Sequence, residues 1–310
     1  MISESIGGLY LLSEDALEKY RKAGRIAAET REIVRGLVRE GMPIINLCEK
    51  VEAYIRQNGG KPAFPCNVCI NEVTAHYTSP PGDTKTVPEG AVVKVDIGVQ
   101  VDGYIADTAL TTCFNPEYDI LVFSAEEALR RAIQAIRPGI RASEIGTIIQ
   151  RSIEVHGLKP IWNLTGHQIA RYIIHTGKSL PNVAHLNGMK LEVDEVYAIE
   201  PFVTIAKAAG EVQEADEAYI YRVFREKPPK EIYAKRLFEA IKHEFKTLPF
   251  AKRWLGSVCQ LENLEANFST LLKTKNIVAY PVLIEKTGRV VAQAEHTLIV
   301  TKNGCEVITL

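Results

Sequence analysis

The sequence lacks an excess of charge of either sign: its 310 residues include 37 Lys and Arg against 38 Asp and Glu, for a net charge of −1. No basic field is therefore available to attract nucleic acid or an anionic membrane surface. No uninterrupted apolar run reaches the roughly 20 residues that span a bilayer. The N-terminal stretch has no basic region ahead of its short apolar patch, so we expect no secretory signal. These absences indicate a cytoplasmic protein without a membrane partner or a specific nucleic-acid partner.

Cysteine is sparse and scattered, which argues against a disulfide framework. The six cysteines lie at positions 48, 66, 69, 113, 259 and 305 of a long chain without secretory features, a distribution that indicates reduced thiols in the cytosol. Cys66 and Cys69 form a lone CxxC pair, which cannot close a four-cysteine zinc site. We interpret this pair as incidental.

The first part of the chain predicts a pair of amphipathic helices. Ser13 is a suitable N-cap for the first helix, which is expected to end by Gly41. Asn46 and Glu49 form a plausible capping pair for the second helix, which is expected to stop at residues 58–60.

A second pair of helices follows, and it repeats the first. One helix is expected to open at residues 124–127, a Pro–Gly break follows at 138–139, and another helix runs from about residue 143 to 156. A constant offset of 98 residues pairs Gly41 with Gly139, Gly59 with Gly157, Lys61 with Lys159 and Pro62 with Pro160. Two such copies predict two halves related by pseudo-twofold symmetry.

Strands are expected after each helix pair. The segments rich in β-branched and aromatic residues are 91–100, 101–114, 195–206, 216–224, 276–285 and 290–300. Between them, residues 226–276 are helical by period and composition, so we interpret this stretch as a helical insertion packed on the surface of the second half. Without a low-complexity linker, one catalytic domain spanning residues 1–310 is favoured over two independent domains. The predicted fold class is α+β.

Five residues spread over two hundred positions could together hold divalent metal ions. Asp96 and Asp107 lie in two neighbouring predicted strands with an Asp-Gly turn signal near their midpoint, so a hairpin would bring them roughly opposite each other on one face. His167, Glu200 and Glu295 lie in or beside later strands. Carboxylates and imidazole are ligands for divalent metals, and a two-metal site prepares water for hydrolysis. Taken one at a time, each residue could equally be a surface or structural group.

At this point the ordered segments can be compared with known families. FPCNVCINEVTAHYTSP, VVKVDIGVQVDGYIADTALTT, LTGHQIARYIIHTGKSLPNV, LEVDEVYAIEPF and the final AYPVL with VAQAEHT resemble the type 2 methionine aminopeptidases of metallopeptidase family M24, most of all the short archaeal form. The resemblance runs from about Leu12 to the end. It implies the pita-bread fold, in which two pseudo-symmetric α/β halves surround a curved antiparallel sheet. The type 2 enzymes also carry a helical insertion at this place.

The resemblance implies a role for each of the five residues. Asp96 would chelate one metal, Asp107 and Glu295 would bridge two, and His167 and Glu200 would complete the second. Glu200 would also accept and pass on a proton. The two divalent ions would be Co, Mn, Fe or Zn.

The resemblance also implies the residues that contact the substrate. His76 would contact the scissile amide and His175 the substrate carbonyl oxygen, while Phe64, Ile174 and Tyr280 would line the methionine pocket. His243 is a further candidate for the pocket. The expected activity is removal of the initiator methionine from nascent polypeptides whose second residue is small, by a monomer in the cytoplasm, with transient ribosome contact as a further expectation.

Two alternatives remain open from the sequence. One is an Xaa-Pro peptidase of the same fold, although such enzymes carry a separate domain ahead of the catalytic one, whereas here the repeat starts by residue 13. The other is a non-catalytic relative that binds RNA or protein. Such relatives lose metal ligands and tend to be basic, whereas here all five ligand positions are filled and the net charge is −1.

Overall fold

The computed structural model describes residues 5–6, 9–10, 12–185, 188–259 and 263–310. Ahead of the body of the molecule lie the short strands β1 (Ser5–Ile6) and β2 (Leu9–Tyr10). The first half then has helices α1 (Glu14–Leu37) and α2 (Ile44–Gln57), followed by β3 (Lys61–Pro62), β4 (Asn67–Ile70), β5 (Val73–Ala75), β6 (Val92–Val101) and β7 (Tyr104–Cys113). A 3-10 turn (Pro116–Tyr118) leads out of this half.

The second half repeats the order of two helices and then strands. It has helices α3 (Asp119–Ala135) and α4 (Ala142–Glu154), followed by β8 (Leu158–Pro160), β9 (Thr165–Ile169), β10 (Ser179–Pro181), β11 (Val196–Ile199), β12 (Phe202–Ile205) and β13 (Val212–Val223). After the helical segment described below come β15 (Ile277–Glu285), β16 (Val291–Gln293), β17 (His296–Thr301) and β18 (Gly304–Val307).

The predicted repeat has a structural basis in its glycines. Gly41 and Gly139, which precede the second helix of each pair, have φ of 75° and 82°, and Gly59 and Gly157, which follow it, have φ of 79° and 70°. Positive φ is readily available only to glycine. The second helix of each pair therefore begins and ends beside glycines of the same backbone conformation, and each pair leads into a short strand, β3 or β8.

The N-terminal ends of three helices show where the sequence predicted a helix start correctly and where it did not. The Ser13 side chain accepts a hydrogen bond from Ala16 N (3.2 Å), which confirms the predicted cap of α1. The predicted capping pair of α2 is wrong, because that helix starts at Ile44 after Pro43 and has no side-chain cap. Helix α3 starts at Asp119, five residues earlier than predicted, because the 3-10 turn capped by Asn115 leads directly into it.

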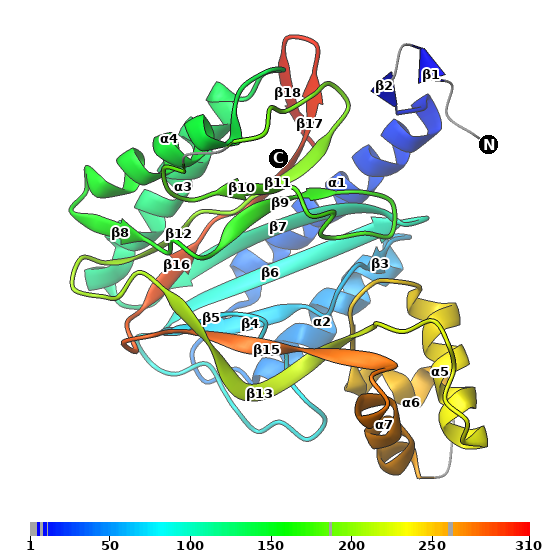
Figure 1. The fold of residues 1–310 in the computed structure, drawn as a ribbon. Helices are drawn as coiled ribbons and strands as arrows, with labels where there is room; N and C mark the ends of the chain where they lie inside the picture. The colour runs from blue at the N-terminus through cyan, green and yellow to red at the C-terminus, as the bar shows by residue number, and fades with distance from the viewer. Residues whose placement is uncertain (1–4, 7–8, 11, 186–187, 260–262) are drawn as a thin grey trace.

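Residues 226–276 are largely helical, as predicted. They contain α5 (Ile232–Phe245), β14 (Phe250–Ala251), a short 3-10 helix (Lys252–Trp254), α6 (Leu255–Val258) and α7 (Leu264–Lys273). The short strand β14 pairs with β13, a feature that the helical period did not predict. These helices form a lobe at the lower right of Figure 1. The lobe has a hydrophobic cluster of its own. Its description as an insertion remains a prediction.

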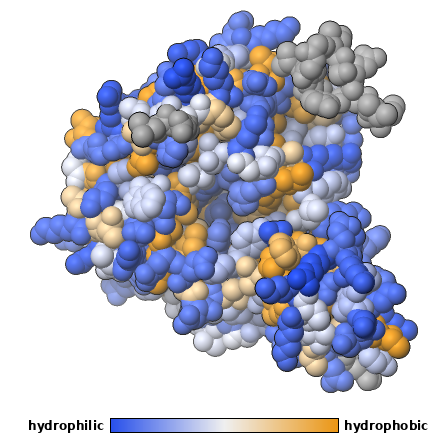
Figure 2. All heavy atoms as spheres, viewed as in Figure 1, coloured by the Kyte–Doolittle hydropathy of each residue, from blue (hydrophilic) through white to orange (hydrophobic). Residues whose placement is uncertain are grey.

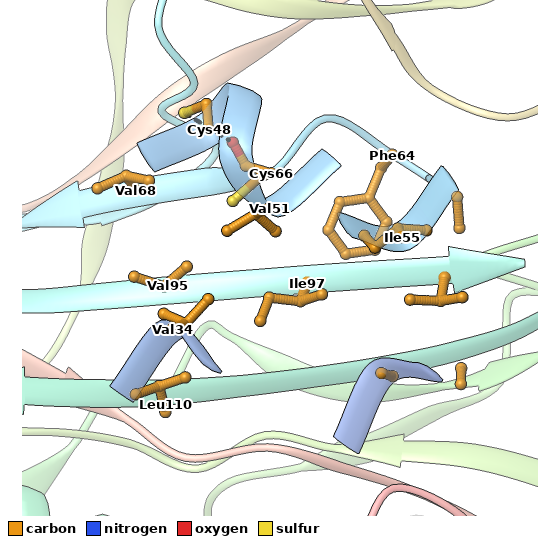
Figure 3. Close-up of a cluster of buried hydrophobic side chains, with 14 of the residues drawn as sticks. Val34, Cys48, Val51, Ile55, Phe64, Cys66, Val68, Val95, Ile97 and Leu110 are labelled. Carbon is orange, nitrogen blue, oxygen red and sulfur yellow. Dashed lines mark hydrogen bonds between the residues drawn. The ribbon is translucent and has the colours of Figure 1, made fainter. Parts of the chain in front are cut away.

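The sheets meet along β6 and β7, which cross the middle of the molecule in Figure 1. One core lies between α1, α2 and the β6–β7 hairpin, and a second lies between α3, α4 and the strands of the second half. Figure 3 shows the first core, with Val51 and Ile55 of α2 on one side of β6 and Val34 of α1 on the other. An antiparallel bridge between Ala109 and Glu295 joins the strands of the two halves.

Candidate metal centre and active site

The β6–β7 hairpin places Asp96 and Asp107 on the same face. The Asp102–Gly103 turn has positive φ at both residues, 52° and 89°, as a two-residue hairpin with a primed turn requires. In the resulting register Asp96 faces Ala109 and Asp107 faces Gly98. The two aspartates are therefore diagonal neighbours rather than directly opposite each other, which corrects the expected pairing.

His167 and Glu200 come from the neighbouring strands β9 and β11. His167 pairs with Ala198, and Glu200 follows the end of β11, where Pro201 interrupts the strand path. The His167 Nε2 atom lies 3.6 Å from Asp107 Oδ2 and 3.6 Å from Glu200 Oε1. Its Nδ1 lies 2.8 Å from the Ile174 carbonyl oxygen. A backbone acceptor at Nδ1 places the proton there and leaves Nε2 free to bind a metal.

Glu295 lies between β16 and β17 and reaches the same place from the second half. Its backbone forms the bridge to Ala109, two residues from Asp107. Gln293 donates a hydrogen bond from Nε2 to Glu295 Oε2 (3.1 Å), which orients the carboxylate. Ligand atoms of Asp107, His167 and Glu295 all lie within 4.8 Å of one another, and these three residues are buried.

The electrostatics of this cluster disfavour several charged carboxylates side by side unless a cation neutralises them. Burial, which disfavours the charged form, raises the pKa of Asp96 to about 7. Burial and the neighbouring carboxylates raise the pKa of Asp107 and Glu295 well above the usual value, and burial with Asp96 does the same for Glu200. Burial also lowers the pKa of His167 to about 3, which keeps its imidazole neutral.

The donor set fits divalent metal ions. The Oδ1 atoms of Asp96 and Asp107 are buried without a hydrogen-bond partner among the described residues. Unsatisfied anionic oxygens are costly to bury, and a bound metal removes that cost. Four carboxylates and one neutral imidazole are the ligands that Mn²⁺, Fe²⁺, Co²⁺ and Zn²⁺ accept.

These residues line a cavity of about 230 Å³ that also contains the substrate residues predicted from the sequence. Figure 2 shows the corresponding face of the molecule, with the surface hollowed beside the lobe of α5–α7. The lining includes all five metal-ligand candidates together with His76, His175, Phe64, Ile174 and Tyr280. The fold therefore brings together residues that are up to 231 positions apart, from Phe64 to Glu295.

The two histidines differ in how they are held. His76 has a positive φ of 66°, its Nδ1 lies 3.1 Å from the Pro281 carbonyl oxygen, and its ring packs edge-on against Tyr280. His175 is exposed at the mouth of the cavity, and its ring centroid lies 4.3 Å from that of His167. Desolvation lowers the pKa of His76. The pKa of His175 is also lowered, mainly by desolvation and in addition by the charges of His76 and Arg222. Both imidazoles are therefore neutral at pH 7.

Some of the cavity wall was missed from the sequence. Asn67, Phe202, Ile220 and Pro249 also line the cavity. No local pattern in the sequence marks these four residues as part of a cavity. Asn67 could have been noticed, because it lies on β4 directly opposite Asp96 of β6. His243 is exposed on α5 and does not line the cavity, so the suggestion that it contributes to the pocket is wrong. The approach of the lobe is made instead by Pro249, just before β14.

Comparison with known proteins gives this site a family. The model of metallopeptidase family M24 matches residues 18–302. A methionine aminopeptidase from Methanothermobacter thermautotrophicus is 46% identical over 299 residues, which cover 94% of this chain and 98% of that protein. The structure of a thermophilic Arx1 matches with a TM-score of 0.81 at 19% identity, covering 96% of this chain and 91% of that one. The structure of the methionine aminopeptidase from Thermotoga maritima matches with a TM-score of 0.70 at 22% identity, covering 96% and 98%.

A buried cluster of carboxylates and imidazole at the centre of two repeated α/β halves defines a metal-dependent hydrolase. The chain belongs to metallopeptidase family M24. Its architecture is the pita-bread fold that the sequence resemblance implied. Within the described residues, no helix combines the length and apolar character that crossing a membrane requires.

Proposed function

We propose that this protein is a methionine aminopeptidase, which hydrolyses the first peptide bond of polypeptides that begin with methionine and have a small second residue. The observation that carries this proposal is one cavity that combines a five-residue metal centre, two neutral histidines and an apolar wall. The similarity to a methionine aminopeptidase, 46% identical over nearly the whole of both chains, supports the choice of substrate.

In the proposed arrangement two divalent ions share the centre. Asp96 would hold one ion, His167 and Glu200 would hold the other, and Asp107 and Glu295 would be shared by both. Divalent ions at such a centre supply a water of lowered pKa and positive charge for the developing oxyanion. Glu200 accepts the proton of the attacking water and delivers it to the leaving amine.

The two histidines hold the scissile bond. With its Nδ1 proton donated to Pro281 O, His76 presents Nε2 as an acceptor for the scissile amide N–H. Neutral His175, at the mouth of the cavity, donates to the substrate carbonyl oxygen and stabilises its negative charge in the transition state. The two contacts fix the carbonyl carbon beside the metal centre. The free α-amine of the substrate would lie near the metal ligands, which limits cleavage to the first residue.

The apolar wall selects the side chain. Phe64 and Ile174 are buried in the cavity wall, each 7% exposed, and Tyr280 is half-buried. A thioether packs well against aromatic and branched side chains, so methionine suits this wall better than a polar residue does.

The wider setting is part of the same proposal. The enzyme acts as a cytoplasmic monomer on nascent polypeptide N-termini and makes transient contact with the ribosome. All six cysteines are unpaired, as reduced thiols in a cytosol are.

Hydrolysis of Met-Ala-Ser and Pro-Ala-Ser tests the function directly, with Co²⁺, Mn²⁺, Fe²⁺ or Zn²⁺ supplied in turn. We expect cleavage of the methionyl peptide that stops when a chelator is added, and no cleavage of acetyl-Met-Ala-Ser. Preference for the prolyl peptide would instead identify an Xaa-Pro peptidase, and activity that a chelator leaves unchanged would remove the metal centre from the mechanism.

A further inference from the structure

A buried carboxylate on α2 lies behind the wall of the active-site cavity. Glu52 is 2% exposed, and its Oε1 accepts a hydrogen bond from the backbone N–H of Cys66 (3.1 Å). Cys66 follows the pocket residue Phe64 by two positions and precedes Asn67, which also lines the cavity. The first contact of Glu52 is therefore with the backbone of this wall.

The partners of Glu52 come from the helical lobe, about two hundred positions away. Arg253 donates from Nη2 to Glu52 Oε1, and Trp254 donates from Nε1 to Glu52 Oε2 (2.6 Å). The side chains of Arg253 and Glu52 are only 6% and 3% exposed. Pro249, which lines the cavity from the lobe, lies four residues before Arg253. This ion pair therefore fastens the lobe to α2 beside the cavity.

Arg253 also reaches the segment that carries His76. Its Nη1 donates to Thr78 Oγ1 (2.9 Å) and to the Ser79 carbonyl oxygen (3.0 Å). Thr78 Oγ1 in turn donates to the Cys66 carbonyl oxygen (2.7 Å). A single guanidinium thus connects two segments of the cavity wall, one carrying Phe64 and the other His76.

The segment held in this way contains a strained residue. His76 has a φ of 66°, a conformation that side chains other than glycine seldom adopt and that persists only when the surrounding structure imposes it. On one side Pro281 accepts from the imidazole, and on the other the contacts of Arg253 begin two residues later. Arg253 therefore belongs to the set of contacts that hold His76 in place.

Stability alone does not account for the buried pair. Burial raises the pKa of Glu52 even though Arg253 and Trp254 donate to it, so desolvation outweighs the attraction of the partner charges. Buried ion pairs commonly contribute little net stability, and a gain in the specificity of the structure is one reason to retain them. The geometry here indicates what is specified, because the hydrogen bonds of the pair end on the lobe or on the two segments that carry Phe64 and His76.

We propose that Arg253 is a positioning residue that sets the place of His76 and the shape of the substrate pocket by tying the helical lobe to both wall segments. The effect of Arg253 on catalysis rests on the proposed function. Its effect on the structure of the two wall segments does not. Arg253 thereby gives the lobe a role in the reaction although, among the lobe residues that the structure describes, Pro249 alone lines the cavity.

Substitution Arg253→Lys is the sharpest test. Lysine keeps the positive charge, but its single ammonium cannot span Glu52, Thr78 and Ser79 as a guanidinium fork does. We expect kcat/KM for Met-Ala-Ser to fall about 10- to 100-fold, the loss that a small misplacement of a substrate-contacting group produces. The affinity of the protein for Mn²⁺, measured by calorimetry, is expected to stay within about twofold, because no ligand lies on either wall segment.

Hydrogen–deuterium exchange needs no catalytic turnover, so it tests the structural role of Arg253 even if the proposed function is wrong. In Arg253→Lys, hydrogen–deuterium exchange at the amides of Cys66 and Val68 is expected to speed up about tenfold or more, since the former is bonded to Glu52 and the latter to the Tyr77 carbonyl oxygen. Exchange in the β6–β7 hairpin is expected not to change. If the wild-type protein cleaves no methionyl peptide, the proposed function fails while the exchange result still decides the inference.

Two further variants guard the interpretation. Leu271→Ala, in the core of the lobe on α7, lowers the stability of the lobe without touching the ion pair, and kcat/KM is expected to stay within about twofold at temperatures below unfolding. If Arg253→Lys does not fold, Thr78→Val replaces it, because valine removes the hydroxyl that accepts from Arg253 and donates to the Cys66 carbonyl oxygen, while the ion pair stays intact. Wild-type exchange and kcat/KM in Arg253→Lys or its replacement, or an equal loss of kcat/KM in Leu271→Ala, would overturn the proposal.

Discussion

The ring of Phe64 lies directly over Gly98, so that a Cβ atom on Gly98 would stand 2.2 Å from Phe64 Cε1. Gly98 faces Asp107 across the β6–β7 hairpin, and Phe64 lines the cavity. Figure 3 shows Phe64 beside β6, near Ile97 and Ile55. A glycine in the metal-bearing strand therefore fixes the position of a pocket wall, and it connects the metal centre with substrate selection.

Gly98→Ala is expected to push the Phe64 ring into the pocket. Two non-bonded carbon atoms cannot approach to 2.2 Å. The backbone at Gly98 is held by β7 on one side and by the Ala63 N–H, just after β3, on the other, so the ring has to move. We expect kcat/KM for methionyl peptides to fall about 10- to 200-fold, the usual effect of a misfitted apolar pocket. The free energy of unfolding is expected to be about 1–3 kcal/mol lower than that of the wild type.

The matched control is Gly36→Ala on the exposed face of α1. A Cβ there meets nothing within 4 Å, so we expect unchanged kinetics and a gain of roughly 0.5–1 kcal/mol in stability from helix propensity. If Gly98→Ala keeps wild-type activity on Met-Ala-Ser, Phe64 does not shape the methionine pocket.

How far the sequence predicts this molecule depends on the range of the interactions involved. The Asp96–Asp107 hairpin was predictable because a two-residue turn and side-chain alternation are local. The start of α3 is also a local feature, but it was placed too late, because Asn115 caps a 3-10 turn that leads directly into the helix. Pro249 lines the cavity because the lobe docks beside it, and that docking includes contacts between residues about two hundred positions apart. Ile220 lines it because β13 pairs with β15, which places Ile220 opposite Tyr280. Such long-range packing leaves no periodic signal in the chain.

His175→Ala is expected to abolish most turnover while metal binding persists. The imidazole lies at the cavity mouth and is not among the proposed metal ligands, so its loss removes a donor to the substrate oxyanion and leaves the centre intact. We expect kcat to fall about 10²- to 10³-fold, as for other oxyanion donors, and Mn²⁺ affinity by calorimetry to stay near the wild-type value.

His243→Ala is the matched control, because it makes the same histidine-to-alanine change in the lobe. His243 is exposed on α5 and outside the cavity, so all kinetic constants are expected to match the wild type. Full activity in His175→Ala would show that this histidine does not act in the reaction, and weak metal binding in that variant would indicate a role in the metal centre instead.

Metal removal is expected to make the protein less stable as the pH rises. In the chelator-treated protein Asp96 has a pKa of about 7, against 3.8 for an exposed aspartate, because burial disfavours its charge. The folded state therefore binds more protons than the unfolded state between these values, so the stability that this group contributes is complete below pH 3.8 and is lost as the pH rises through about 7. Asp107, Glu200 and Glu295, whose pKa values are also raised, act in the same direction.

The comparison is best made between pH 7.0 and 8.5. Buried His167 and half-buried His296, with pKa values lowered to about 3, act in the opposite direction, but only below about 6.5, where an unfolded histidine gains its proton. Within the chosen window we expect the thermal midpoint of the metal-free protein to fall by several degrees, equivalent to a few kcal/mol at most.

Added Mn²⁺ is expected to raise the midpoint more at pH 8.5 than at pH 7.0, because deprotonated ligands bind it. Asp96→Asn isolates the contribution of one carboxylate and is expected to flatten the pH dependence. A metal-free protein that is more stable at pH 8.5 than at pH 7.0 would show that the four carboxylates are not the crowded anionic cluster that the geometry describes.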